Sequence, residues 1–213
     1  MFRTFTLLIA TAMLSACAAA VVGGAAVGGA AHDRRSFGTV LDDNAIQLGA
    51  YDNLNKDKDL AIKSNVEIVV YNGVVLLIGE VPSEELKARA ETKVREIQGV
   101  QRVVNELRIM PSPNVYSATR DKWITARVKT ALLDIVDLPG FDPTRVNVTT
   151  QASVVYLLGI VTPVEAERVI EIARTVPGVL RVVKVFEYQE APPAKAEAET
   201  KTETGAETQP LAD

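Results

Sequence analysis

The chain contains two copies of one unit, and this internal repeat constrains the fold more than any other feature. Residues 66–109 and 146–188 align with one deletion between the two glycines of each copy. A repeat of this length is a small domain used twice. Shared positions are expected to serve packing, and differing positions are where a function could have been added. The aligned pairs are Val66/Val146, Gly79/Gly159, Val81/Val161, Gly99/Gly178, Val103/Val182 and Val104/Val183.

Both copies predict the same order of elements: helix, strand, strand, helix, strand. In the first copy these elements are expected at 42–54, 66–71, 74–81, Ser83 to Gly99, and 102–109. In the second they are expected at 121–134, 146–151, 154–161, Thr162 to Gly178, and 180–188. The Asn72-Gly73 pair favours a type I′ hairpin turn, whereas Ala152-Ser153 is a weaker turn signal. The sequence therefore predicts an α+β fold of two tandem αββαβ domains, each a three-stranded mixed sheet with two helices on one face.

Residues 1–16 are interpreted as a lipoprotein signal peptide. Arg3 supplies a positive start, and the apolar stretch 5–13 is too short to span a bilayer. It runs into Leu-Ser-Ala-Cys at 14–17, which resembles the bacterial lipobox, where the cysteine is diacylated after cleavage. Cys17 is thus the predicted lipid attachment site. It is the only cysteine, which excludes a disulfide or a cysteine metal site within one chain. An ordinary secretory signal with an incidental cysteine is the alternative.

The segment after Cys17 predicts where the protein resides. Position 18 is Ala rather than Asp, which by the sorting rule of Gram-negative lipoproteins implies the outer membrane, with the protein facing the periplasm. Residues 17–38 are expected to be the lipidated N-terminus and a flexible tether, with a membrane-hugging apolar segment at 18–31 as the alternative. The remaining boundaries are expected at 39–109 for the first domain, 110–120 for a linker, 121–189 for the second domain and 190–213 for a tail.

The tail is acidic and has no aromatic residues. Residues 190–213 carry six acids and two lysines, a net charge of −4 that equals the charge of the whole chain. Such a segment cannot bury enough apolar surface to offset its ordering entropy, so we expect it to be disordered. The rest of the chain is neutral overall.

The repeat resembles the BON domain, a small module of bacterial envelope proteins. The resemblance rests on the hydrophobic–Asn-Gly–Val-x-Leu-x-Gly-x-Val run at 71–81 and on Gly99-Val100 followed by Val103-Val104-Asn105. The second copy matches at 155–161 and 178–183, but it lacks the Asn-Gly turn and has Lys184 in place of the Asn. The resemblance implies phospholipid interaction, support of outer-membrane integrity and a place at division sites.

The first helices of the two copies differ most in charge. Residues 42–55 have three acids and no base, a net −3, whereas the aligned residues 120–133 have four bases and one acid, a net +3. Helical periodicity places an apolar stripe on the core side of the helix expected at 121–134, the first helix of the second copy. The side chains expected on its outer side or flank are Lys122, Trp123, Arg127, Lys129 and Leu133.

Cations beside a Trp and a Leu suit an anionic membrane surface. We therefore predict that this helix binds anionic phospholipid, which is also what the BON resemblance implies. In one alternative, Trp123 fills a groove between the domains and the cations are only solvated. In another, the protein is an interaction scaffold that docks an outer-membrane assembly or cell-wall partner through the same helix or the acidic tail.

Signals for an enzyme are weak, and we expect no catalytic residues, no cofactor and no metal. His32 is the only histidine and lies in the expected tether. The acid pairs Glu84/Glu85 and Glu165/Glu167 open helices, where the helix dipole favours acids. No nucleic-acid partner is expected, since the basic patch is small and the chain is exported.

Overall fold

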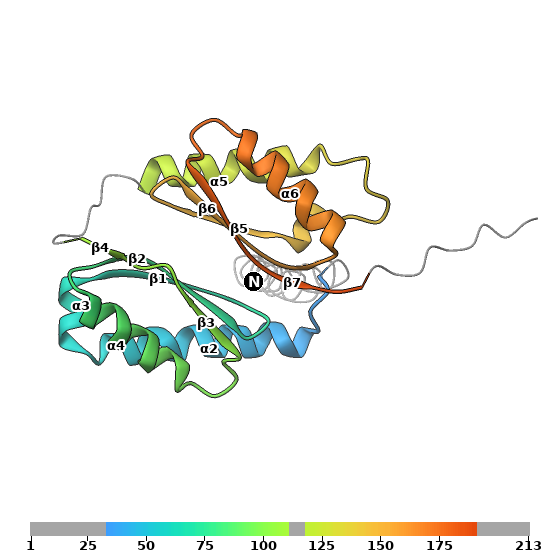
Figure 1. Ribbon diagram of the computed structural model, residues 1–213. Helices are drawn as coiled ribbons and strands as arrows, with labels where there is room; N and C mark the ends of the chain where they lie inside the picture. Colours follow the sequence, from blue (N-terminus) through green and yellow to red (C-terminus); the bar gives the residue numbers. More distant parts are fainter. Residues whose placement is uncertain (1–32, 111–117, 191–213) are drawn as a thin grey trace, which may run out of the picture.

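The computed structural model describes residues 33–110 and 118–190. The predictions for the signal peptide, Cys17, His32, most of the expected tether and most of the acidic tail concern residues outside these ranges. The described residues form two αββαβ units, which confirms the predicted fold class (Figure 1). None of the helices in the described ranges is long and apolar enough to cross a membrane.

The first domain has its helices on one face of a mixed sheet. β1 pairs antiparallel with β2, and β2 pairs in parallel with both β3 and β4. Helix α2 is longer than expected, and the short helix α3 was not expected. The elements are α2 (Phe37–Asn55), α3 (Lys58–Lys63), β1 (Asn65–Tyr71), β2 (Val74–Val81), α4 (Glu84–Arg95), β3 (Arg102–Asn105) and β4 (Arg108–Ile109).

The single strand predicted at 102–109 is wrong, because the chain interrupts it after Asn105. The Asn105 side chain accepts a hydrogen bond from the Leu107 N–H at 3.3 Å and donates to the Lys87 carbonyl at 3.0 Å. This local turn sends Leu107 into the core, where it is buried. The second copy has Lys184 at this position, and its strand β7 runs without a break.

The second domain repeats the arrangement with one continuous final strand. β5 pairs antiparallel with β6, and β6 pairs in parallel with β7. The Thr162 hydroxyl caps the second helix while Glu165 bonds back to the Thr162 N–H, forming a capping box. The elements are α5 (Ala118–Leu133), the 3-10 turn η2 (Pro143–Arg145), β5 (Asn147–Gln151), β6 (Val154–Val161), α6 (Pro163–Thr175) and β7 (Arg181–Tyr188).

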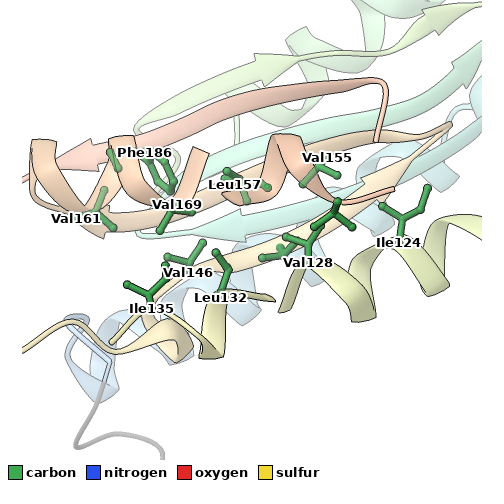
Figure 2. Close-up of a cluster of buried hydrophobic side chains, with 14 residues drawn as sticks. Ile124, Val128, Leu132, Ile135, Val146, Val155, Leu157, Val161, Val169 and Phe186 are labelled. Carbon is green, nitrogen blue, oxygen red and sulfur yellow. The ribbon is translucent and has the colours of Figure 1, made fainter. Parts of the chain in front are cut away.

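The two sheets pack against each other, so the molecule has four layers with helices on both outer sides (Figure 1). Alternate residues of β2 and β6 point to opposite faces. One set packs under the helices of its own domain; in the second domain this set includes Val155, Leu157 and Val161 (Figure 2). The other set joins the domains in one apolar cluster, whose buried members are Tyr71, Val74, Leu76, Ile78, Tyr156, Leu158 and Val185. Both faces of each central strand are therefore buried.

A buried aspartate holds the hairpin turn in each domain. Asp43 accepts hydrogen bonds from the Asn72 and Gly73 N–H groups at 2.7 and 2.8 Å. Asp121 accepts equivalent bonds from residues 152 and 153, also at 2.7 and 2.8 Å. Ala152 and Ser153 have positive φ values of 50° and 63°, so the second turn has the conformation of the first without its favourable residues. The weak turn signal is thus compensated by the carboxylate.

The glycines shared at 79 and 159 let neighbouring backbone segments approach closely. A Cβ atom at Gly79 would lie 2.0 Å from the Asn65 carbonyl oxygen, and one at Gly159 would lie 2.7 Å from the Arg145 carbonyl oxygen. Any larger residue would push the backbones apart. These repeat positions serve packing, as the alignment predicted.

Residues 33–36 fall in the segment expected to be a tether, yet they bind both domains. Arg34 donates to both carboxylate oxygens of Glu165 in α6, at 2.7 and 2.9 Å. Arg35 pairs with Asp43 at 2.7 Å and stacks over the Tyr71 ring with its Cζ 3.8 Å from the centroid. Burial, with the charge of Asp33 beside it, raises the pKa of Tyr71 to about 12, so its hydroxyl stays protonated and donates to Asp33. We call residues 33–36 the N-terminal clasp.

Candidate functional site

Helix α5 lies in an outer layer of the molecule, with one face in the core of its own domain. Ile124, Val128 and Leu132 are fully or almost fully buried beneath it (Figure 2). The five side chains predicted for the site are all exposed, and Trp123 and Leu133 have 52% and 63% of their surface open. We call the exposed side of this helix the α5 face; its members are Arg120, Lys122, Trp123, Arg127, Lys129 and Leu133.

Trp123 lies on the surface of its own domain. The Arg127 guanidinium stacks over the indole, with its Cζ 4.4 Å from the ring centroid. A Cβ at Gly178 would lie 3.9 Å from the indole Cζ3, so this ring covers the turn that follows α6. Since the sheets, not the helices, meet between the domains, the alternative in which Trp123 fills an interdomain groove is wrong.

The cations of the α5 face have no carboxylate partner among residues 33–110 and 118–190. None of the four makes an ion pair with another residue of the described ranges, whereas Arg89 and Arg95 of α4 pair with Glu85 and Glu91. Lys122 does act at longer range on Glu67 of the first domain: burial raises the pKa of that carboxyl, and the lysine charge opposes the rise. Within the part of the chain that the structure describes, the α5 face is therefore a cluster of positive charge without ion-paired acids.

The buried aspartates change the charge contrast between the first helices. Asp43 and Asp121 serve the same structural purpose, so neither belongs to the exposed surface. Without these two aspartates, residues 42–55 have two acids in place of three. Residues 120–133 keep four bases and have no acid. The exposed contrast is −2 against +4, in place of the predicted −3 against +3.

Two exposed apolar residues next to the α5 face were not predicted. Leu180 is 78% exposed and follows the Gly178 turn that the indole covers. Val136 is 90% exposed and lies three residues beyond Leu133 at the other end of the helix. Both lie in loops, where helical periodicity gives no signal. Comparison of the copies gave one hint, since Leu180 aligns with the polar Gln101.

The opposite outer layer has an apolar surface of a different kind. Phe37, Leu41 and Leu48 of α2 are 61%, 53% and 71% exposed. The positions equivalent to the two leucines in α5 hold Thr119 and Ala126. The first helix of each domain thus exposes its own set of side chains, and only the second combines apolar groups with a cluster of cations.

The described residues offer little for catalysis. They contain no group of three His, Cys, Asp or Glu side chains that could hold a metal ion. A pocket of about 550 Å³ lies beside the N-terminal half of α2, and its walls include Asp42, Asn72 and Gln101. In the second domain, the position equivalent to Ala45 in this pocket is occupied by Trp123. The pocket contains no nucleophile paired with a base.

Comparison with known families settles the family of the chain. The model of the BON domain matches residues 42–111 and again residues 120–190. The chain belongs to the BON family. Each match covers one αββαβ unit, so the chain is a dual-BON protein, as the sequence predicted.

Two relatives are similar to this chain over most of its length. Outer membrane lipoprotein DolP of Haemophilus influenzae is 38% identical over 183 residues, which cover 85% of this chain and 93% of that protein. The 21 kDa hemolysin of Actinobacillus pleuropneumoniae is 35% identical over 156 residues, covering 73% and 79%. The chain is similar to DolP along both BON domains. Among solved structures, the C-terminal domain of CdsD from Chlamydia trachomatis covers 67% of this chain and 96% of its own length, with 12% identity and a TM-score of 0.28.

Proposed function

We propose that this protein is a non-enzymatic outer-membrane lipoprotein anchored through Cys17 and facing the periplasm. The lipobox-like sequence at 14–17 and the similarity to outer membrane lipoprotein DolP support this location. Several acyl chains, at about 0.8 kcal/mol per buried methylene, hold a protein stably on a membrane. In this proposal the BON domains work at the membrane surface.

The α5 face binds anionic phospholipid in this proposal. The observation that carries it is a cluster of cations, unpaired with any carboxylate of the described residues, around a half-exposed indole on an outer layer of the molecule. Each cation near an anionic surface contributes about 1 kcal/mol, and an indole favours the interfacial zone. Leu133, Val136 and Leu180 add apolar side chains at the two ends of the face. Together these groups match a headgroup layer with acyl chains beneath it.

The anchor and the face would act as two separate signals. The acyl chains select the membrane, and the α5 face then selects regions rich in anionic lipid. Support of outer-membrane integrity and enrichment at division sites are the cellular consequences that we propose, by analogy with the BON family.

An NMR titration of the lipid-free protein from residue 18 onward tests the proposal. With vesicles or micelles of phosphatidylglycerol, we expect the largest shifts at α5 and at the Trp123 indole. Trp123→Ala, and charge reversal of Lys122, Arg127 and Lys129, should each weaken binding by at least tenfold. Unchanged binding in both variants would refute the lipid site. Crosslinking in membranes from position 123 to a single protein, without a lipid-dependent shift, would instead support the scaffold alternative.

A further inference from the structure

Two parts of the chain carry large charges of opposite sign. The α5 face carries four cations and no exposed acid among the aligned residues 120–133. Residues 190–213 carry six acids and two lysines, a net −4. These two sets are of opposite sign and equal size.

The acidic segment starts at the end of the sheet where α5 also ends. β7 finishes at Tyr188 beside Val161, and the Gln189 N–H donates to the Val161 carbonyl at 3.0 Å. Ile135, just after α5, lies with Val146 and Val161 at one end of the core cluster, whereas Ile124 lies at the other (Figure 2). The chain therefore leaves the second domain at the same end of the sheet as the C-terminal end of α5, from the opposite edge strand (Figure 1).

The length of the segment matches the length of the face. Helix α5 has 16 residues, which corresponds to about 24 Å. The segment from 191 to 213 has 23 residues, and a flexible chain of that length has a root-mean-square end-to-end distance of roughly 26 Å. Attachment at such a distance gives an effective concentration in the millimolar range, so even weak ion pairs become populated.

We propose that the acidic C-terminal segment 190–213 docks on the α5 face of its own chain and competes there with anionic lipid. This inference rests on the proposed function, because it concerns what else occupies the same surface. The carboxylates of the segment take the place of lipid phosphates beside Lys122, Arg127 and Lys129. The contacts are exposed ion pairs, so they weaken as salt rises and the Debye length falls to about 8 Å at physiological ionic strength.

Competition of this kind sets a threshold for membrane binding. A surface with few anionic lipids cannot displace the segment, while a surface rich in them replaces it completely. The segment therefore raises the density of anionic lipid at which half of the protein is bound.

The test uses the protein from residue 18 to 213, compared with a variant of the same length whose tail acids are changed to amides. Without lipid and at low salt, we expect the two spectra to differ at the α5 amides and at the Trp123 indole. High salt should remove the difference. On vesicles of phosphatidylglycerol and phosphatidylcholine at low salt, the neutral tail should bind about fivefold more tightly. The changed residues are Glu190, Glu197, Glu199, Glu203, Glu207 and Asp213.

A second variant separates docking from simple repulsion by the membrane. Changing Arg120, Lys122, Arg127 and Lys129 to Gln should abolish the spectral effect of the tail. Tighter vesicle binding by the neutral tail with identical α5 spectra would overturn docking, because the tail would then act only by repulsion. Identical spectra and identical binding would also overturn it. If the tail shifts α5 and neither form binds vesicles, docking holds and the proposed lipid function fails.

Discussion

At the residue scale, one buried aspartate in each first helix holds the neighbouring hairpin turn. In the second domain, Ala152 and Ser153 both adopt left-handed conformations that cost roughly 1–2 kcal/mol each. Two charge-assisted hydrogen bonds from their N–H groups to Asp121 offset this cost. The acid was counted as surface charge in the sequence because its partners lie about thirty positions away.

Replacement of Asp121 therefore destabilises the second domain. Asp121→Asn removes one acceptor and the charge, and we expect a loss of about 2 kcal/mol in the free energy of unfolding. Installing the first-domain turn, Ala152→Asn with Ser153→Gly, should recover about 1 kcal/mol in the same background. Denaturant unfolding measures both changes. Asp134→Asn, at an exposed position just after α5, is the control and should change stability little. If Asp121→Asn and Asp134→Asn lowered the free energy of unfolding equally, Asp121 would not be the residue that stabilises the hairpin turn.

The pair of Arg34 and Glu165 makes stability depend on pH. Burial acts to raise the pKa of Glu165, but the Arg34 guanidinium and the Thr162 N–H outweigh it, so the pKa lies below 4.5. A lowered pKa stabilises the folded state above pH 4.5, and that contribution is lost as the pH falls through the folded value.

Arg34→Ala should therefore cost about 2 kcal/mol at pH 7 and progressively less as the pH falls below 4.5. Urea unfolding from pH 7 to pH 3 measures this convergence. Lys56→Ala removes an exposed ion pair within α2 and serves as the matched control, with a small effect at any pH. A constant difference between Arg34→Ala and the natural protein across this range would show that Glu165 does not respond to Arg34.

At the element scale, local signals were sufficient for most of the fold. The strands β2 and β6, the caps Ser83 and Thr162 and the exposed side of α5 were all predicted from periodicity and capping. Features that depend on distant partners were not. The break after Asn105 follows from a side-chain bond to α4, and the sheet-to-sheet contact follows from both faces of β2 being apolar. A run of buried residues does not reveal what covers each face.

The loops at the two ends of α5 extend the proposed lipid contact. Leu180→Ser and Val136→Ser should each weaken binding to phosphatidylglycerol vesicles about threefold, because each removes an exposed apolar side chain next to the cations. Vesicle sedimentation measures the change. Ile62→Ser, at a residue 78% exposed on α3 of the other domain, should leave binding unchanged. If the control weakens binding equally, the contact is not confined to the second domain.

At the scale of the whole molecule, the two BON domains share one buried apolar interface. Each would expose an apolar sheet face without the other, since Leu76 and Leu158 are fully buried in their shared cluster. Single domains of this size have a small free energy of unfolding. The duplication thus provides each sheet with the cover that a single copy lacks.

We expect one cooperative unfolding transition for both domains. Leu158→Ala should cost about 3 kcal/mol and lower the midpoint reported by probes in either domain equally. Amide hydrogen exchange gives the comparison, with β2 of the first domain as the distant reporter. Leu157→Ala, on the opposite face of the same strand, is a control for loss of volume. Loss of protection confined to the second domain in Leu158→Ala would show that the domains unfold separately.

The N-terminal clasp has a mechanical consequence. Arg34 and Arg35 are consecutive, yet the first holds α6 of the second domain and the second holds Asp43 of the first. A pull on the chain before residue 33 reaches both ion pairs before it reaches the first turn of α2. The force therefore acts first on the contacts that join the two domains. Helix α2 begins to unwind only after the ion pairs of both arginines have broken.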